Sequence, residues 1–335
     1  MKIALTAESY REPSAYVAER RGIWSREWLM FCTTAELEKP GDYFAGEIAG
    51  WNLLLTVDPD GFIVGFHNVC PHRAGVIAWP GQGTLGNLVC KYHGWAFAWD
   101  GSLKSARDFG NDEPLCAADS ELKKIRVETW GPLVFVCLSP DAPALTEALG
   151  SLPDQAAQYP IDTFTFARRM TRELVCNWKT YVDNYLEGYH VQLLHPSLNR
   201  ALKMSTYKVS VHDDSFCIHE CETAEGSVVG GVWLFRYPNL AINIYPDGMN
   251  VERIVPIGHD RTHVVYDYFS LDVSEENIAR MVEMSNEILD EDQLMCELVQ
   301  RNLDAGIYEA GRLSPKHEIC LNWFQDRVRS AVASV

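Results

Sequence analysis

The sequence predicts an α+β protein built from two modules, and three observations support this prediction. From residue 41 to residue 138, short runs rich in β-branched and aromatic residues alternate with Asp-Gly, Pro-Gly and Trp-Gly-Pro turns, which is typical of antiparallel strands. After residue 160, a helical stretch stands among further strand-like runs. A long helical pattern then extends from Glu275 to about Asn302. A sheet flanked by helices fits this second module.

The same pattern divides the chain into four parts. Residues 1–40 are predicted as an N-terminal helical segment that packs on a later domain, because residues 14–35 mix apolar and charged positions at helical spacing. The all-β module occupies residues 41–140. Residues 141–160 are rich in proline and are predicted as a linker that contains a short helix. The second domain occupies residues 161–335.

Composition and charge exclude some classes of function. The chain of 335 residues has 29 basic and 46 acidic residues, a formal net charge of −17 and no basic stripe, so binding to nucleic acid or to an anionic membrane is disfavoured. The first residues have no signal-peptide pattern, and nowhere do about 18 apolar residues run uninterrupted. We therefore expect a cytoplasmic protein. Ten scattered cysteines predict reduced, buried thiols, apart from any that bind a metal.

The stretch NWKTYVDNYLEGYHVQLLH, residues 177–195, has the spacing of a metal site. If it is helical through His190, then Asp183, Glu187 and His190 share one face, and His195 follows five residues later, before Pro196. Two imidazoles and one carboxylate from elsewhere would form the 2-His-1-carboxylate face of non-heme Fe(II) oxygenases. The alternative is a buried amphipathic helix whose histidines bind backbone carbonyls.

Two Cys/His loops form the strongest motif. Cys70-Pro71-His72 and Cys90-Lys91-Tyr92-His93 each supply one thiolate and one imidazole from a tight loop at the end of a strand. Four such ligands can bind a structural zinc, or a [2Fe–2S] cluster with two thiolates on one iron and two imidazoles on the other. The cluster is favoured because zinc ribbons usually pair two cysteines in each knuckle.

A third group, Cys217, His219 and Cys221, also looks like a metal site. On a strand these alternate residues share one face, but their Cβ atoms run in a row about 6.6 Å apart, which fits one tetrahedral ion poorly. A sheet face packed by small thiols is the favoured interpretation.

With these motifs in place, the chain resembles the Rieske non-heme iron oxygenases, nearly from end to end. The segments that carry the resemblance are, in order, NVCPHRAGV, LVCKYHGWAFAWDG, NWKTYVDNYLEGYHVQLLH and DEDQLMCELVQRNL. The resemblance implies a [2Fe–2S] domain followed by a catalytic domain of the helix-grip type, an open antiparallel sheet covered by helices. One departure is Ala74-Gly75, where the family usually has a single glycine.

The resemblance also implies the ligands of the cluster. Cys70 and Cys90 would bind one of its irons, and His72 and His93 the other.

For the mononuclear iron, the resemblance implies His190, His195 and Asp292. Asp183 and Glu187 compete for the role of the acid that joins the two centres, and the motif match gives this role to Glu187. In the family the electron route crosses from the cluster of one subunit to the iron of its neighbour in a trimer, through this acid. A homotrimer is therefore expected.

The expected activity is that of a terminal oxygenase component, which uses O₂ and electrons from a separate reductase to oxidise a small molecule. The chain has no flavin or nicotinamide motif of its own, so an NAD(P)H-dependent flavin and iron–sulfur reductase is implied as partner. The alternative of another class is an iron–sulfur electron carrier or a zinc-binding protein without catalysis. Such a protein would have no need for the second set of ligands.

Details of the catalytic half resemble the branch that contains choline, glycine betaine, stachydrine and carnitine oxygenases. The expected reaction is then monooxygenation that leads to N-demethylation or C–N cleavage, and the runner-up is hydroxylation or O-demethylation of an aromatic acid. Aromatic faces hold a trimethylammonium group best, by cation–π attraction. The candidates for such a cage are Tyr185, Trp233, Phe235, Tyr237 and Tyr245.

Overall fold

The computed structural model describes residues 2–110, 115–116, 119–224 and 231–334. The chain forms two compact units. We call Glu27–Ala142 the β unit, and Met1–Arg26 together with Pro143–Val335 the helix–sheet unit. None of the helices in the described ranges has the length and apolar character needed to cross a membrane.

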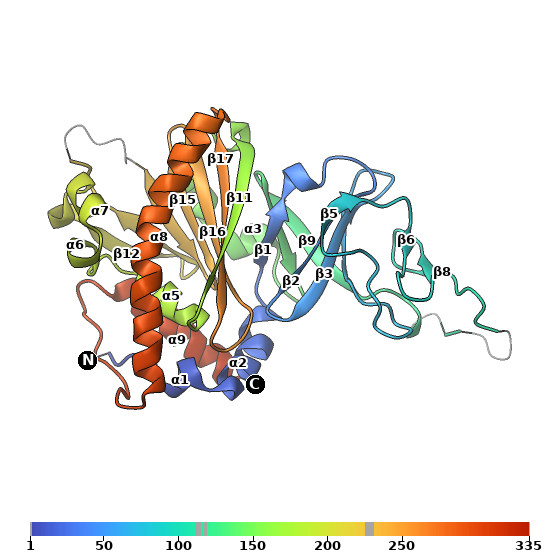
Figure 1. Ribbon diagram of the computed structural model, residues 1–335, viewed down its shortest axis with the longest axis horizontal. Helices are drawn as coiled ribbons and strands as arrows, with labels where there is room; N and C mark the ends of the chain where they lie inside the picture. Colours follow the sequence, from blue (N-terminus) through green and yellow to red (C-terminus); the bar gives the residue numbers. More distant parts are fainter. Residues whose placement is uncertain (1, 111–114, 117–118, 225–230, 335) are drawn as a thin grey trace. The chain divides into compact units, whose positions relative to one another are not determined.

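The β unit is built on a seven-stranded sheet in which every neighbouring pair is antiparallel. In spatial order its strands are β1 (Leu29–Thr33), β10 (Leu133–Cys137), β9 (Lys124–Trp130), β4 (Ile63–His67), β3 (Trp51–Val57), β2 (Asp42–Ile48) and β5 (Gly81–Thr84). A smaller sheet carries the second Cys/His loop and consists of β6 (Leu88–Val89), β7 (Ala96–Phe97) and β8 (Leu103–Ser105). Figure 1 shows both sheets in blue to green.

The helix predicted over residues 14–35 is wrong in its second half. Leu29–Thr33 form strand β1, in which all five residues are buried and which pairs with β10. The periodicity of a short apolar run fits a buried strand and a buried helix equally well. Here the run forms a strand because it pairs with β10 at the edge of the sheet. The helical elements of this segment are α1 (Glu8–Arg11), α2 (Pro13–Glu19), the π-helical turn η1 (Arg20–Trp24) and, after β1, the short 3-10 helix η2 (Thr34–Glu36).

The helix–sheet unit holds a second seven-stranded antiparallel sheet. Its strands in spatial order are β11 (Thr165–Leu174), β17 (Thr262–Ser270), β16 (Gly248–Pro256), β15 (Leu240–Tyr245), β14 (Val232–Arg236), β13 (Phe216–Glu220) and β12 (Lys208–His212). Two long helices pack on this sheet, α8 (Glu275–Asp304) beside β11 and β17, and α9 (Ile319–Ala333) beside β12.

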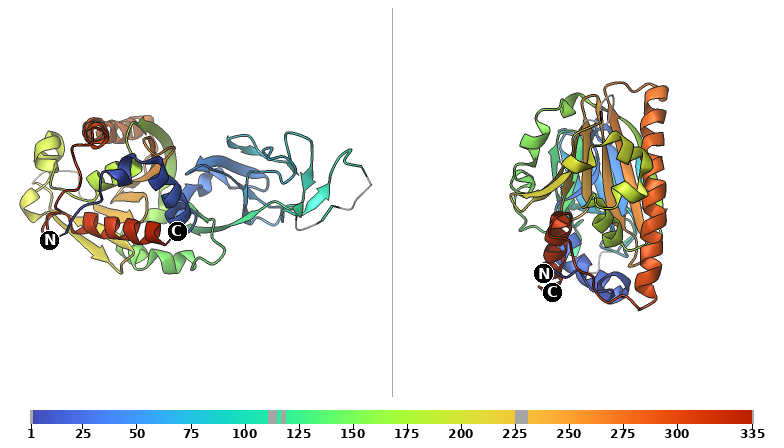
Figure 2. Two further views of the ribbon diagram at one scale, coloured as in Figure 1. Left: turned by 90° about the horizontal axis from the view of Figure 1, so that it is seen from below. Right: turned by 90° about the vertical axis from the view of Figure 1, so that its left-hand side faces the viewer.

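Short helices complete the unit. They are α3 (Leu145–Leu149), α4 (Leu152–Ala156), η4 (Ile161–Thr163), α5 (Trp178–Tyr185), α6 (Val191–Leu194), α7 (Pro196–Ala201) and η5 (Met204–Thr206). The beginning and the end of the chain meet in this unit, where α2 packs against α9, as both views of Figure 2 show.

Helix α5 ends earlier than the sequence predicts. It begins at an N-cap, Asn177, whose side chain accepts a hydrogen bond from the Lys179 N–H, and it ends at Tyr185, not at His190. Gly188 lies against the ring of Tyr207, where an added Cβ would overlap the ring. The connection between α5 and α6 contains Glu187.

A buried ion pair holds α5 to the N-terminal helices. The Lys179 ammonium and the Glu19 carboxylate, both buried, form this pair, and the Trp178 indole N–H donates to the second Glu19 oxygen at 2.8 Å. The N-terminal residues thus fix the element that leads into the site.

Candidate metal centres and adjacent cavity

Two histidines and an aspartate converge in the helix–sheet unit. His190 and His195 flank α6 at its two ends, and Asp292 projects from the middle of α8. Their three donor atoms all lie within 4.8 Å of one another. The two Nε2 atoms are 3.1 Å apart, and Asp292 Oδ1 lies 3.0 Å from His195 Nε2 and 3.8 Å from His190 Nε2.

These distances fit a metal ion. Two donors that are each about 2.1 Å from an ion and at right angles to each other are separated by about 3 Å. Two neutral imidazoles and a carboxylate on one side of an ion form the face typical of non-heme Fe(II). In this arrangement His190, His195 and Asp292 would hold the iron and leave its other side open.

Each of the three groups is oriented by a further polar partner. His190 Nδ1 contacts Glu187 Oε1 at 2.6 Å, and His195 Nδ1 contacts Glu291 Oε2 at 2.7 Å. A carboxylate only accepts, so both Nδ1 atoms carry the proton and both Nε2 atoms are free to bind a metal. The Asn184 amide donates to Asp292 Oδ1 at 2.7 Å.

The other predicted acid lies elsewhere. Asp183 accepts hydrogen bonds from the Tyr10 hydroxyl and from the Gln325 amide, at 2.5 and 3.1 Å. Burial raises the pKa of Asp183 to about 7. The two hydrogen bonds and the positive charge of Lys179 lower this pKa, but burial has the larger effect. Asp183 therefore belongs to the anchoring of α5, while Glu187 contacts His190.

In the β unit, the two Cys/His loops have the same backbone. In each loop the cysteine N–H donates to the carbonyl five residues later, and the cysteine carbonyl accepts from the N–H four residues later. The residues at this fourth position are Ala74 and Gly94, and both are left-handed, with φ of 55° and 74°. The loops thus present Cys70 and Cys90 as a matched pair.

The donors of these loops form two pairs and not one tetrahedral group. Cys70 and Cys90 are buried and in contact, and the rings of His72 and His93 have centroids 4.7 Å apart. In the described part of the chain, only the His190, His195 and Asp292 group brings three donor atoms within 4.8 Å, so these loops do not converge on a single ion. A two-iron cluster, which needs a thiolate pair and an imidazole pair, fits better than zinc.

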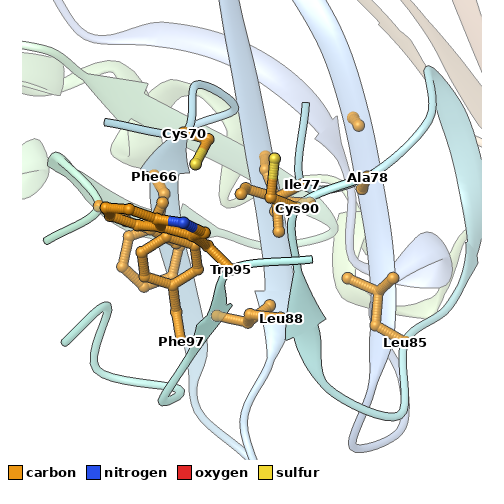
Figure 3. Packing of buried hydrophobic residues seen from close by; sticks show 12 residues of the cluster. Phe66, Cys70, Ile77, Ala78, Leu85, Leu88, Cys90, Trp95 and Phe97 are labelled. Carbon is orange, nitrogen blue, oxygen red and sulfur yellow. The ribbon is translucent and has the colours of Figure 1, made fainter. Parts of the chain in front are cut away.

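Two further observations favour a bound cluster. The Nδ1 atom of His72 is buried and has no hydrogen-bond partner among the described residues. Burial, with the neighbouring Cys90, raises the pKa of Cys70 to about 11, so this sulfur would keep its proton at neutral pH unless a metal displaced it. Figure 3 shows Cys70 and Cys90 beside Trp95 within a packed apolar group.

A cavity of about 410 Å³ adjoins the His190, His195 and Asp292 group, which lines it. Its sheet wall contains residues that are direct cross-strand partners on five successive strands, from β13 to β17. We call these residues the cavity row, and they are His219, Trp233, Asn243, Asn250 and Tyr268.

Three of the five aromatic residues predicted for a cation cage line this cavity, namely Tyr185, Trp233 and Tyr245. The Tyr185 hydroxyl donates to Asn243 Oδ1 at 2.9 Å. The other two, Phe235 and Tyr237, are buried and do not line the cavity. Their rings lie about 6 Å from that of Phe324 on α9, with centroid distances of 6.1 and 6.0 Å.

A buried carboxylate also lines the cavity. Glu252 on β16 accepts hydrogen bonds from the Asn243 amide at 2.8 Å and from the Tyr181 hydroxyl at 3.2 Å. Burial raises its pKa to about 7, an effect that the negative charge of Asp292 strengthens and these hydrogen bonds oppose. A cation in the cavity would keep Glu252 ionised.

Comparison with known protein families identifies both units. Residues 27–124 match the family described as "Rieske [2Fe-2S] domain". Residues 161–226 and 219–334 match the family described as "Ring hydroxylating alpha subunit (catalytic domain)". The chain belongs to the Rieske ring-hydroxylating oxygenases. This Rieske oxygenase is therefore an oxidoreductase with a [2Fe–2S] cluster and a mononuclear iron. As an oxygenase component, it works with a separate reductase, O₂ and a small-molecule substrate.

Its curated relatives include choline monooxygenase of Arabidopsis thaliana, 31% identical over 90% of this chain and 77% of the relative. The carnitine monooxygenase oxygenase subunit of Escherichia coli (strain K12) is 27% identical over 92% of this chain and 87% of the relative. Among solved structures, the quaternary ammonium Rieske monooxygenase CntA in complex with L-carnitine has a TM-score of 0.87 at 25% identity, over 98% of this chain and 95% of that one. Naphthalene 1,2-dioxygenase from Rhodococcus sp. shares the fold, with a TM-score of 0.78 at 17% identity, over 98% and 94%.

Some site residues of this Rieske oxygenase carry no signal in the sequence. In the sequence, Glu291 is one of two neighbouring acids on a predicted helix, and Asn184 is a polar residue next to Asp183. Glu252 and His219 lie on strands whose sequences have no feature that marks a site. Only the pairing of the strands from β13 to β16 shows that both residues line the same cavity.

The Cys217, His219 and Cys221 motif has separate roles. Cys217 packs in the buried face of the sheet next to Cys320, His219 lines the cavity, and Cys221 Sγ lies 3.5 Å from the Lys203 carbonyl oxygen. In the described residues they do not form a group of three metal donors.

Proposed function

We propose that this oxygenase oxidises a quaternary ammonium compound of the choline, betaine or carnitine type, by monooxygenation at a carbon next to nitrogen. The observation that carries the proposal is the cavity beside His190, His195 and Asp292, in which aromatic faces and the buried Glu252 carboxylate stand together. Aromatic rings and an anion attract a cation that cannot donate a hydrogen bond. The choline and carnitine monooxygenases among its relatives support the same substrate class.

We assign the ligands as the sequence predicts. Cys70 and Cys90 would bind one iron of the cluster, and His72 and His93 the other. The mononuclear iron would bind to His190, His195 and Asp292. When bound, the two centres supply one-electron storage and O₂ activation.

The residues of this chain position the substrate and hold protons at defined atoms. Tyr185, Trp233 and Tyr245 would surround the trimethylammonium group, and Glu252 would balance its charge. The overall change is balanced when O₂, two electrons and two protons convert the substrate C–H bond to C–OH and release water. A hydroxyl on the carbon next to nitrogen then makes the C–N bond break, which yields an aldehyde, a tertiary amine and a proton.

Glu187 is proposed as the bridge between centres of neighbouring subunits in a homotrimer. Its carboxylate lies 2.6 Å from His190 Nδ1, and its side chain is 12% exposed, so one edge of it can be reached from outside. Tyr189 and Leu193 beside it are 62% and 92% exposed, and Trp79 and Tyr92 of the β unit are 62% and 57% exposed. We propose that these exposed apolar side chains take part in the contact between subunits. The cytoplasmic location stays a prediction.

The decisive experiment is a substrate panel with the oxygenase and an NAD(P)H-dependent reductase. Choline, glycine betaine and carnitine would be compared with benzoate and methoxybenzoates, and cofactor consumption would be scored together with aldehyde or hydroxylated product. We expect coupled turnover only with the quaternary ammonium compounds. Coupled turnover of an aromatic acid alone would replace the proposed substrate class with the runner-up.

A further inference from the structure

His219 on β13 is a buried histidine of the cavity row with one ring nitrogen unaccounted for. The residue is 6% exposed and lines the cavity. Its Nδ1 atom lies 2.7 Å from the hydroxyl of Tyr207, whereas its Nε2 atom is buried and has no hydrogen-bond partner among the described residues. A buried polar atom without a partner destabilises a fold, so its persistence in a cavity wall points to a ligand.

The surroundings of His219 place it in the substrate cage. Its ring centroid is 5.3 Å from that of Tyr185, and on the sheet it is the direct cross-strand partner of Trp233. These are two of the three aromatic residues proposed to surround the cation. The imidazole therefore lies next to the position proposed for the trimethylammonium group.

The hydrogen bond to Tyr207 determines which nitrogen of His219 carries the proton. If Nδ1 carried it, the Tyr207 hydroxyl hydrogen would have no acceptor among the contacts of that residue. If the hydroxyl donates to Nδ1, the proton is on Nε2, and every donor of the pair is satisfied once an oxygen atom accepts from Nε2. The ring stays uncharged, because burial and the nearby His190 lower the pKa of His219 to about 4.

We propose that His219 is a specificity-determining residue, whose Nε2–H donates a hydrogen bond to an oxygen atom on the substituent of the quaternary ammonium substrate. This inference rests on the proposed function. The oxygen could be the hydroxyl of an amino alcohol or the carboxylate of a betaine, since both accept a hydrogen bond. Metal binding and O₂ activation do not require this contact.

The test compares substrates that differ only in this oxygen. Dissociation constants are measured by calorimetry on the iron-loaded protein without O₂, for choline, glycine betaine and propyltrimethylammonium, the last having a methyl group in place of the hydroxyl of choline. In His219→Phe we expect choline to bind about tenfold more weakly, and glycine betaine tenfold to a hundredfold more weakly if its carboxylate is the natural acceptor. Propyltrimethylammonium should bind within about twofold of its original affinity.

Matched variants separate this role from a structural one. His219→Gln keeps an N–H near the position of Nε2 and should restore most of the selectivity for an oxygen-bearing substrate. Tyr207→Phe/His219→Phe leaves no unpaired hydroxyl behind and guards against a variant that fails to fold. His212→Phe, at a histidine of the neighbouring strand that contacts Ser210 and does not line the cavity, should change no affinity.

The outcomes are distinct. Equal weakening of all three ligands in His219→Phe, or unchanged affinities for both choline and glycine betaine, overturns the role of His219 and leaves the proposed function standing. If none of the three ligands binds to the original protein, the proposed function and this inference both fall. A selective loss for the oxygen-bearing ligands, restored by His219→Gln, supports the inference, and the larger loss identifies the acceptor.

Discussion

At the scale of single residues, Glu187 orients one of the proposed metal ligands, His190. One carboxylate oxygen receives the Nδ1–H of His190, and the other accepts from the backbone N–H of His190, so the acid also caps the turn that leads into α6. The residue thus fixes the ring that faces Asp292 and His195. Its proposed part in electron transfer adds a second role that can be tested apart from the first.

We expect Glu187→Gln to keep both metal centres and to lower coupled turnover by more than 10- to 100-fold, the range typical for loss of a group that orients a metal ligand. The matched control is Glu291→Gln, which removes the corresponding contact from His195 Nδ1. Product formed per NAD(P)H consumed, with iron measured on the same sample, checks the prediction. If both variants lost the same amount of coupled turnover, Glu187 would only orient His190 and would have no separate part in electron transfer.

Asp183 should make the stability of the protein depend on pH. Its folded pKa of about 7 is raised above the ordinary 3.8, so ionisation opposes folding, and stability falls as the pH rises from about 4 to about 7. Asp183→Asn removes this cost and should raise the free energy of unfolding by up to about 4 kcal/mol at pH 8, and by less than half as much at pH 5. Urea denaturation at the two pH values measures the difference. A gain that is the same at both would refute this role of the charge.

At the scale of elements, helix α5 depends on the N-terminal segment. The Lys179 ammonium is buried against Glu19, and the backbone before it is capped by Asn177. An eight-residue helix is too short to be stable alone, so this anchoring determines where the following turn presents Glu187 and His190.

Glu19→Ala should therefore cost about 3–5 kcal/mol, because it leaves a buried ammonium without its partner. Lys179→Met combined with Glu19→Leu should cost much less, since no charge is then buried. Thermal unfolding of the two variants at the same pH checks this order. If the double variant were the less stable of the two, the ion pair itself would be the stabilising element.

At the scale of the whole molecule, the two metal centres reside in separate units and should be lost separately. In Cys90→Ala the chain should lose the visible absorption of the cluster and retain about one iron, out of about three when both centres are full. Asp292→Ala should show the reverse pattern, with the cluster spectrum intact and about one iron missing. Iron analysis and absorption spectra on the same preparations distinguish the two, and joint loss of both centres in either variant would contradict the assignment.

Prediction from the sequence succeeds where the functional residues are close to one another in the chain. The Cys/His loops are short, so their ligands can be recognised within four residues, and the two histidines around α6 are five residues apart. Local spacing failed at Leu29–Thr33, whose apolar run suits a helix and a buried strand alike, and at the end of α5, which comes at Tyr185 although the spacing suits a helix through His190. The positions of Glu252 and His219 in the cavity could not be predicted, because they depend on which strands are neighbours in the sheet.

The cavity row has a consequence for how this enzyme can diversify. Its five members come from five different strands, whereas the proposed donors of the mononuclear iron come from helices and the turns between them. A member of this row can thus be replaced while the reactive centre stays on its own scaffold. Deleting a single residue from the connection between β14 and β15 would instead turn the following strand over and send its cavity side chains to the opposite face. Point substitution is therefore the route by which descendants of this chain can acquire new substrates, and insertions or deletions in these connections are the route by which they lose them.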